Sequence, residues 1–486
     1  MTDVVGKLWG YAHSLRHDGV DYGDYIEQLT YLLFLKMADE QAIELPMYVD
    51  KDPAGSDVQV PCDWPHLRKQ SGTELTEHYS KLLVALGKQQ GMLGDIFSGA
   101  QNRLTKPATL SRLIKAIDET EWTSLDVDVK AAAFEGLLEK SAAEGKKGAG
   151  QYFTPRPLIR TMVRLIQPDP RAHRQFTICD PACGTGGFLV AAYEWLKEET
   201  GGALDRETAK QVRASTYYGQ ELVERPRRLA LMNLYLHQVD PHITLGDSLY
   251  EAPDSRRYDV VITNPPFGNR GANQAPVRED FTIETANKQL NFVQHVLTIL
   301  KPGGRAAIVV PDNVLFADKA GEVFEILMQD ADVHTVLRCP RGTFNPYTPG
   351  TNTNVIFFTK GRPTRKVWVY DARANVPKIT KKSRPLTPAH FAEFEKCYGG
   401  DPNGLSERAI GDSPENRWRS FTIDEVRERH YKLDSFKWLR DEDLDDPDEL
   451  PEPEELITEA MEELQLALDG LIDMQKLLGN GSGGVL

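Results

Sequence analysis

The chain has 486 residues, of which 27% are charged and 9% aromatic, a composition typical of a globular protein and not of a disordered or fibrous one. Its formal net charge of −15 argues at first against nucleic-acid binding, because phosphate contacts need Lys and Arg. The acidity is local, however: residues 441–486 hold 15 Asp or Glu and one Lys, which leaves 56 basic and 57 acidic residues in 1–440. A near-neutral body is expected to bind DNA poorly alone, so the charge predicts dependence on a complex.

Cysteine usage and hydropathy indicate the compartment. The five cysteines are an odd number without any C-x-x-C pair, which argues against a disulfide framework or a zinc site and fits a reducing compartment. The first residues lack a basic region followed by an apolar core, and no apolar run is long enough to span a bilayer. We therefore expect a cytoplasmic protein that contacts no membrane.

The first 145 residues are predicted to be helical. Apolar residues recur at spacings of three and four through residues 25–37, 75–93 and 129–140. The polar, proline-containing stretch from 50 to 65 is expected to form a loop.

From residue 147 onward, short runs rich in β-branched and aromatic residues alternate with helix-length segments. These runs are residues 176–179, 217–219, 243–245, 258–263, 306–310, 333–337 and 354–358. Such alternation predicts an α/β fold with a doubly wound parallel sheet that helices cover on both faces. Ligands of such sheets bind at the carboxyl ends of the strands, so functional residues are sought just after each run.

The last part of the chain is unevenly charged. Residues 360–384 contain nine Lys or Arg and one Asp, whereas residues 441–455 form an acidic linker. Beyond the linker, apolar residues recur at heptad spacing, which predicts a helix with one apolar face. They are Ile457, Met461, Leu464, Leu468 and Leu471.

A glycine-rich segment follows the first predicted strand: Asp180-Pro-Ala-Cys-Gly-Thr-Gly-Gly-Phe188. Its glycines permit a tight turn and allow a ligand to approach the main chain at the start of the next helix. The segment does not match the dinucleotide pattern G-x-G-x-x-G, and Asp180 disfavours a pyrophosphate and favours a cationic group such as the ammonium of a methionine moiety. Cys183 is interpreted as a small loop residue and not as a nucleophile. The alternative interpretation is a glycine-rich turn without any ligand.

Two further acids follow strands. Glu221 comes after the run 217–219, where an acid can accept both hydroxyls of a ribose. Asp247 comes after the run 243–245, where it could accept a hydrogen bond from an amino group. Each has an ordinary alternative, a solvated helix-start glutamate for Glu221 and a helix N-cap for Asp247.

The most informative segment is Asn264-Pro265-Pro266-Phe267, directly after the run 258–263. The prolines end the strand and stiffen the loop. An asparagine oxygen and a backbone carbonyl can then accept hydrogen bonds from one planar amine, while the aromatic ring stacks on the attached base. Two acceptors around an exocyclic amine orient its lone pair toward an electrophile and favour the developing positive charge.

These residues resemble the S-adenosylmethionine-dependent amino-methyltransferases of DNA. Asp180 to Phe188 matches their cofactor loop, and Asn264 to Phe267 matches their catalytic motif. A Gly-Gln-Tyr-Phe-Thr-Pro-Arg-Pro block at residues 150–157 narrows the resemblance to the modification subunit of type I restriction–modification systems. The resemblance implies a seven-stranded variant of the doubly wound sheet, with an N-terminal helical domain and a C-terminal helical tail.

The same resemblance implies a domain division and site roles. The domains would be 1–145 (helical), 146–385 (catalytic), 386–440 (an extension of the catalytic domain) and 441–486 (acidic linker and assembly helix).

The methionine end of the cofactor would be covered by Gln151, Tyr152, Phe153, Thr154, Pro155 and Arg156, together with Gly184, Thr185, Gly186 and Gly187. Glu221 would hold the ribose and Asp247 would approach the cofactor adenine. Asn264 and the Pro265 carbonyl would hold N6 of a flipped adenine in double-stranded DNA, with Pro266 completing the motif and Phe267 stacking on the base. The transfer would be a direct in-line displacement without any covalent intermediate or metal.

Partners are also implied. The chain has too few residues outside the sheet for a target-recognition domain, so a specificity subunit is expected to read the sequence, with two modification subunits per specificity subunit and a motor endonuclease subunit in the restriction complex. Residues 360–384 are the candidate phosphate-contacting segment, or else a solvated hairpin. The helix at 457–471 is expected to pair with a partner, or else to pack on its own domain. Methylation of RNA or of protein glutamine, a non-catalytic assembly role, and an N4-cytosine target are the alternatives.

Overall fold

The computed structural model describes most of the chain, in the residue ranges 22–52, 54–122, 154–237, 239–267, 275–345, 350–380, 383–408, 416–434, 436 and 438–439. Several predictions lie outside these residues: the helix at 129–140, the site residues Gln151, Tyr152 and Phe153, the acidic linker and the helix at 457–471.

The N-terminal part is mainly helical. Its helices are α2 (Tyr22–Glu40), α3 (Trp64–Lys69), α4 (Gly72–Gly87), α5 (Met92–Phe97) and α6 (Pro107–Asp118). Buried side chains such as Leu29, Tyr79 and Ile117 pack these helices together. None of the helices in the described ranges is both long and apolar enough to cross a membrane.

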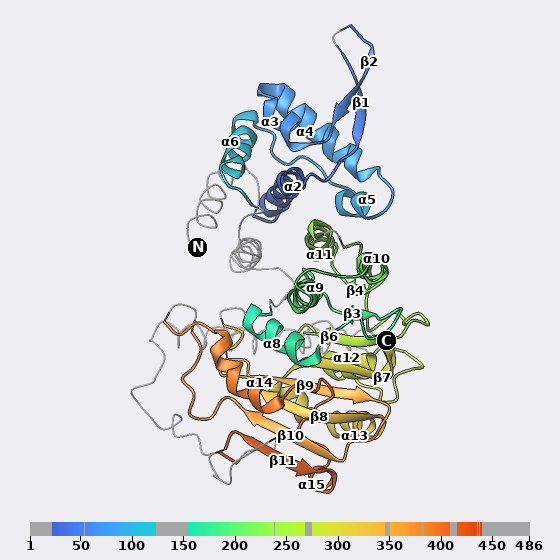
Figure 1. The fold of residues 1–486 in the computed structure, drawn as a ribbon, viewed down its shortest axis with the longest axis vertical. Coiled ribbons are helices and arrows are strands. Elements are labelled where there is room, and N and C mark those ends of the chain that lie inside the picture. Colours follow the sequence, from blue (N-terminus) through green and yellow to red (C-terminus); the bar gives the residue numbers. More distant parts are fainter. Residues whose placement is uncertain are drawn as a thin grey trace, which may run out of the picture.

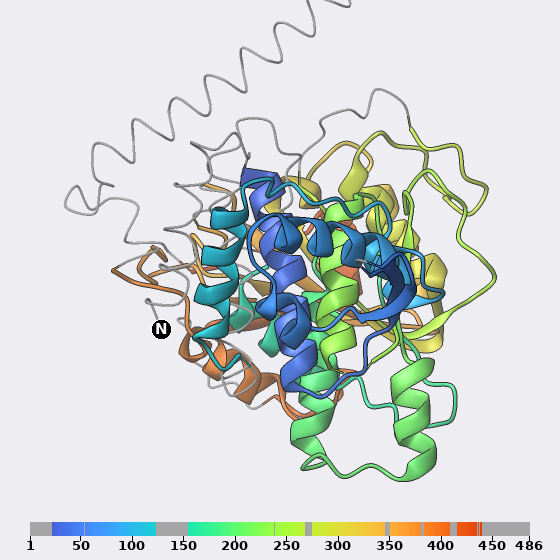
Figure 2. The same ribbon diagram turned by 90° about the horizontal axis from the view of Figure 1, so that it is seen from above.

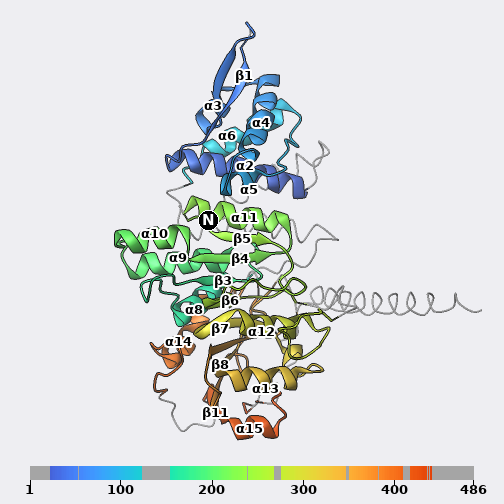
Figure 3. The same cartoon turned by 90° about the vertical axis from the view of Figure 1, so that its right-hand side faces the viewer.

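The loop prediction for residues 50–65 was wrong. This stretch includes the end of β1 (Met47–Lys51) and all of β2 (Asp57–Pro61), which pair antiparallel, and it ends in the start of α3. Val58 and Val60 alternate with polar residues, which is the period of a strand, but the flanking prolines and aspartates obscured it. Figure 3 shows this hairpin projecting from the top of the N-terminal helices.

Nine strands of the described residues form one sheet in the order β11-β10-β8-β9-β7-β6-β3-β4-β5. Their bounds are β3 (Ile178–Asp180), β4 (Tyr217–Glu221), β5 (His242–Leu245), β6 (Tyr258–Thr263), β7 (Leu300–Pro311), β8 (Ala331–Arg338), β9 (Thr353–Lys360), β10 (Lys366–Asp371) and β11 (Trp418–Thr422). All seven predicted runs are strands. They form a continuous block from β5 to β8, and the sheet runs from β5 near the N-terminal helices to β11 at the opposite end, as Figures 1 and 3 show together.

Two features of the predicted sheet need correction. Its count of seven strands was too low, because β10 and β11 extend it beyond β8. It is also mixed and not purely parallel, since β9 runs antiparallel to β7 and β8, and β11 runs antiparallel to β10. No helix lies between β8 and β9 among the described residues, and a connection without a crossover helix allows the chain to return antiparallel.

Helices cover both faces of the sheet, as expected. One face packs on α8 (Arg156–Ile166), α9 (Gly187–Glu199), α11 (Glu224–Leu236) and α14 (Ala392–Tyr398), and the other on α12 (Lys288–Ile299), α13 (Ala320–Asp330) and α15 (Ile423–Glu428). The helix α10 (Arg206–Ala214) precedes β4. Along β6, Val260 and Ile262 face the first layer while Val261 faces the second, which is the alternation of a strand buried on both sides.

The N-terminal helices rest on α11. Arg228 of α11 is buried and donates to the Tyr31 hydroxyl (2.6 Å) and the Ser98 carbonyl (2.8 Å), and it also pairs with Glu27. Figures 2 and 3 show the N-terminal helices lying over α11 at the end of the sheet that contains β5. A buried arginine thus joins the two parts of the chain.

Candidate active site

The acids and the asparagine singled out in the sequence lie on neighbouring strands. The strands β4, β3 and β6 are adjacent and parallel, with Asp180 in register with Gly219 and Ile178 with Val260. Asp180 and Glu221 end β3 and β4, and Asn264 directly follows β6. The structure therefore brings these three residues to one carboxyl edge of the sheet.

The glycine-rich loop is open to a ligand at one position and closely packed at another. Gly184 has a φ of +53°, and a Cβ there would meet no atom within 4 Å. Gly186 has a φ of +80° and caps α9, and a Cβ there would lie 3.1 Å from Cβ of Ala230 on α11. The Thr185 carbonyl accepts a hydrogen bond from Nδ2 of Asn233, also on α11 (3.1 Å). The loop is thus held from α11, while its main chain at Gly184 stays open.

Glu221 is fixed by the same loop. Its Oε2 accepts from the backbone N–H of Gly184 (2.9 Å), and its Oε1 accepts from the N–H of Val223 (2.9 Å). Burial raises the pKa of Glu221 above its ordinary value, and the two backbone N–H groups act in the opposite direction. Sequence analysis missed Leu222, whose side chain is 62% exposed directly after this acid. The position of this exposed apolar side chain next to Glu221, a predicted site residue, was the available signal.

Asp180 and Cys183 are buried residues of the glycine-rich segment. Asp180 is only 1% exposed, and its Oδ1 accepts from the N–H of Ala182 (3.1 Å). Burial raises the pKa of Asp180 to about 7. Burial also raises the pKa of the Cys183 thiol well above its ordinary value, which keeps this sulfur protonated and fits a packing role.

Asp247 closes a turn after β5. Its Oδ1 accepts from the N–H groups of Leu249 (2.9 Å) and Tyr250 (3.3 Å), but residues 248–250 form a turn and no helix begins there, so the helix N-cap alternative was wrong. The neighbouring Ser248 donates its hydroxyl to the Pro181 carbonyl (2.5 Å) and so ties this turn to the cofactor loop.

The side chain of Asn264 contacts Thr154, which belongs to the block 150–157 that precedes the sheet. Its Nδ2 donates to the Thr154 hydroxyl oxygen (2.9 Å), and its Oδ1 is buried without any hydrogen-bond partner among the described residues. A buried acceptor without a donor costs about 1–3 kcal/mol, which a bound amine would recover. Pro155 is the N-cap of α8 and Arg156 begins that helix, so the block is anchored directly beside the asparagine.

The rest of the motif is supported by two residues that the sequence did not reveal. The Pro266 carbonyl accepts from Nε2 of Gln289 on α12 (2.9 Å), while Pro265 is buried. The half-buried ring of Phe267 packs edge-on against the buried ring of Phe344, with centroids 5.3 Å apart and planes 72° apart. Gln289 is a polar residue on the buried face of an apolar helix, which was a weak signal, whereas Phe344 follows no motif.

Arg278 joins the two sides of the site. Its side chain is 1% exposed and donates to the Ser248 carbonyl (2.6 Å), and it pairs with Asp280 through two hydrogen bonds (2.9 and 2.5 Å). It also donates to Nδ1 of His295 on α12 (3.1 Å), whose pKa burial lowers to about 3 so that the ring stays neutral. Ser248 in turn donates its hydroxyl to the Pro181 carbonyl of the glycine-rich loop. Arg278 is therefore connected to that loop through Ser248.

Comparison with known proteins agrees with this geometry. The family model of N-6 DNA methylases matches residues 125–446, and that of the HsdM N-terminal domain matches residues 4–117. The type I restriction enzyme StySPI methylase subunit of Salmonella potsdam is 39% identical, covering 99% of this chain and 96% of its own. The EcoKI methylase subunit of Escherichia coli (strain K12) is 38% identical, with coverages of 98% and 96%.

Solved structures show the same relationship. The EcoKI M protein superposes with a TM-score of 0.55 at 34% identity, covering 98% of this chain and 96% of that one. A chain from a structure of a type I restriction–modification system reaches a TM-score of 0.65 at 28% identity, covering 99% of both chains. The chain therefore belongs to the N-6 DNA methylase family and, within it, to the methylase subunits of type I restriction enzymes.

Proposed function

We propose that this subunit transfers the methyl group of S-adenosylmethionine to N6 of an adenine flipped out of double-stranded DNA, with Asn264 as the residue that holds the amine. The observation that supports this most directly is the buried Oδ1 of Asn264, which no described residue satisfies while Nδ2 is committed to Thr154. The asparagine is thereby oriented with its acceptor toward an incoming donor.

The two acceptors of the motif act on one amine. Oδ1 of Asn264 and the Pro265 carbonyl accept the two N–H groups, which turns the lone pair of the amine out of conjugation with the ring and favours the charge that develops on nitrogen. Gln289 engages the neighbouring Pro266 carbonyl and so fixes the direction of the loop. Phe267 stacks on the flipped base, and its contact with Phe344 holds the ring in place.

The cofactor loop fits S-adenosylmethionine, which supplies an electrophilic methyl group when bound. The open main chain at Gly184 accommodates its methionine part, beside the Thr154 to Arg156 block. Glu221 retains lone pairs on both oxygens for ribose hydroxyls, and Leu222 covers the purine. Asp180 attracts the ammonium group from beneath the loop, and Asp247 approaches the cofactor adenine with the oxygen that does not cap the turn.

Sequence recognition is assigned to a partner. Residues 418–422 form β11 of the catalytic sheet, which supports treating 386–440 as an extension of the catalytic domain 146–385 and not as a recognition domain. We propose that two copies of this chain join one specificity subunit, through the C-terminal segment 441–486 among other contacts, and that a motor endonuclease subunit joins them in the restriction complex. The helical domain 1–145 then stands beside the catalytic domain on α11.

The test is methyl transfer by the chain in complex with its specificity subunit. Labelled methyl groups are expected at adenine N6 of duplex DNA, identified by nucleoside analysis after digestion. Label in protein, in RNA or at cytosine N4 would overturn the proposal.

Asn264→Ala should keep cofactor affinity, measured by calorimetry, and lose transfer by at least about 100-fold, because removing one preorganised electrostatic partner costs that much. Loss of both cofactor affinity and methyl transfer would mean that Asn264 supports the fold and does not hold the amine.

A further inference from the structure

The basic segment 360–384 is divided by a strand that the sequence did not reveal. β10 occupies residues 366–371 and runs parallel to β8, and hence in the same direction as β7, β6 and β3. Its first residue lies at the amino edge of the sheet and its last at the carboxyl edge. The turn with Arg362 and Arg365 therefore lies at the edge opposite to Asn264, whereas residues 372–384 emerge at the edge of the active site.

Two of the nine basic residues serve the fold. Lys360 donates to the carbonyls of Leu297 and Leu300 (2.7 and 3.1 Å). Arg373 is 4% exposed and binds Asp312 (2.6 Å) and the carbonyl of Thr353 (2.6 Å), which fastens the segment to the carboxyl end of β7 and to the amino end of the antiparallel β9. The sequence counted these residues as part of one basic segment, but Arg373 is buried and Lys360 is engaged by two backbone carbonyls.

The remaining part of the segment is attached to the loop that supports the catalytic ring. The N–H of Ile379 donates to the Arg341 carbonyl (2.8 Å), and Nδ2 of Asn345 donates to the Ile379 carbonyl (2.8 Å). Gly342 has a φ of +75°, and a Cβ there would lie 2.4 Å from the Ile379 carbonyl oxygen, so this close approach requires glycine. The same loop contains Phe344, which packs against Phe267.

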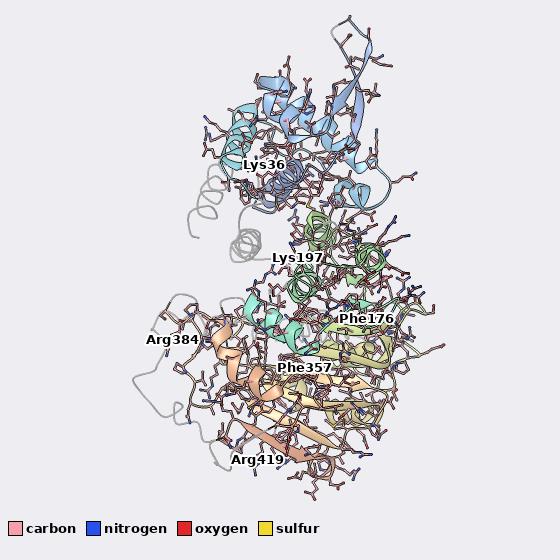
Figure 4. All side chains as sticks on the ribbon, viewed as in Figure 1. Lys36, Phe176, Lys197, Phe357, Arg384 and Arg419 are labelled. Carbon is pink, nitrogen blue, oxygen red and sulfur yellow. The ribbon has the colours of Figure 1, made fainter. Side chains whose placement is uncertain are left out.

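Two hydrogen bonds join Thr380 and Arg384, which follow this attachment. The N–H of Thr380 donates to the Arg384 carbonyl (3.0 Å), and the N–H of Arg384 donates back to the Thr380 hydroxyl (2.9 Å). Residues 372–384 contain five Lys or Arg and no Asp or Glu. Figure 4 shows Arg384 near α14, well separated from Arg419 on β11. Ile379 thus attaches this cationic stretch of the sequence to the loop that contains Phe344.

We propose that Lys378 and Arg384, which flank the attachment at Ile379 and Thr380, contact the phosphates of the DNA backbone next to the flipped adenine. The proposal rests on the proposed function and specifies which surface faces the DNA. Lysine and arginine side chains contact phosphates without reading sequence, which fits a subunit whose specificity is supplied by a partner. The link through Arg341, Gly342 and Phe344 would hold the phosphate contact at a constant distance from the base pocket.

The experiment compares two double variants in the complex with the specificity subunit. Lys378→Gln with Arg384→Gln removes charge at the active-site edge, and Arg362→Gln with Arg365→Gln removes the same charge from the same segment at the opposite edge. DNA affinity is measured at several salt concentrations. Each lost phosphate contact lowers the slope of log affinity against log salt by about 0.9, so the first variant should lose between about 1 and 2 and the second close to zero.

The outcomes separate this proposal from the proposed function. Equal slopes for the first variant and the unmodified complex, or equal losses in both variants, would overturn the phosphate contact. Lys378→Arg with Arg384→Lys should keep the full slope, whereas a loss there would assign the effect to packing and overturn the charge argument. Methyl transfer to DNA by the unmodified complex is measured in parallel, and its absence would instead refute the proposed function.

Discussion

At the residue scale, the site is built by pairs of side chains that the sequence presents far apart. Asn264 and Thr154 are joined by one hydrogen bond that fixes the amide orientation. Pro266 is engaged by Gln289, and Phe267 by Phe344. Each supporting residue acts through a residue of the motif, so we regard Thr154, Gln289 and Phe344 as positioning residues.

The buried carboxyl group of Asp180 predicts a pH dependence of cofactor binding. Its pKa of about 7 means that, in the protein without cofactor, the Asp180 carboxyl group is partly protonated near neutrality. A bound cation favours the carboxylate and lowers this pKa, so binding should release a proton, and affinity should rise with pH up to tenfold per unit below pH 7 and level off above it. Calorimetry in buffers of different ionisation enthalpy measures the released proton.

The control for this prediction is Asp180→Asn, which removes the titration and leaves the shape. The part of the pH dependence that arises from the cofactor's own amine is common to both proteins. The difference between the two profiles therefore isolates Asp180. Identical profiles would show that the buried carboxyl does not sense the ligand.

At the element scale, α11 connects the cofactor loop with the N-terminal helices. Its Ala230 and Asn233 contact Gly186 and Thr185 of the loop, while its Arg228 reaches α2 and the Ser98 carbonyl. One helix thus contacts the loop and the N-terminal helices at once.

We expect Arg228→Met to destabilise the chain and to weaken cofactor binding. Removing one member of a buried ion pair costs about 3–5 kcal/mol, because Glu27 and the Tyr31 hydroxyl lose a buried partner. Arg225→Met is the matched control on the same helix, since its side chain is 46% exposed and lies 3.8 Å from Asp24 and 3.9 Å from Glu27, where exposed pairs contribute less than about 1 kcal/mol each. Chemical denaturation and cofactor titration measure both effects. Similar losses in the two variants would contradict a specific role of Arg228.

At the scale of the whole molecule, one sheet contains both the strands of the candidate active site and strand β11 of the C-terminal extension. β11 and α14 come from residues after 386, and Glu395 of α14 accepts from Thr161 and Arg164 of α8 (both 2.5 Å). Since α8 begins two residues after Thr154, the extension also steadies the block that orients Asn264. The acidic segment after residue 441 lies outside the described residues.

The apolar series in the C-terminal segment predicts how assembly can be disrupted. Leu464→Asp places a charge at a heptad position and should abolish or strongly weaken association with the specificity subunit, measured by analytical ultracentrifugation, while cofactor affinity is unchanged. Gln465→Asp adds the same charge one position away and should leave association intact. Normal association of Leu464→Asp would exclude this helix as the assembly element.

Local patterns in the sequence determined much of this protein. The alternation of runs predicted all seven strands from β3 to β9, and the segments at Asp180 and Asn264 pointed to the family. These signals are readable because strand periodicity and glycine or proline chemistry are properties of adjacent residues.

Only the tertiary structure decided which distant residues meet. The pairing of Thr154 with Asn264, the supports Gln289, Phe344 and Arg278, and the burial of Arg373 all join residues separated by tens of positions or more. β10 lies inside a segment whose charge masks its alternation, and its direction divides that charge between two edges of the sheet. The physical reason is that burial and strand order depend on contacts across the fold, whereas composition reports only that a residue is basic.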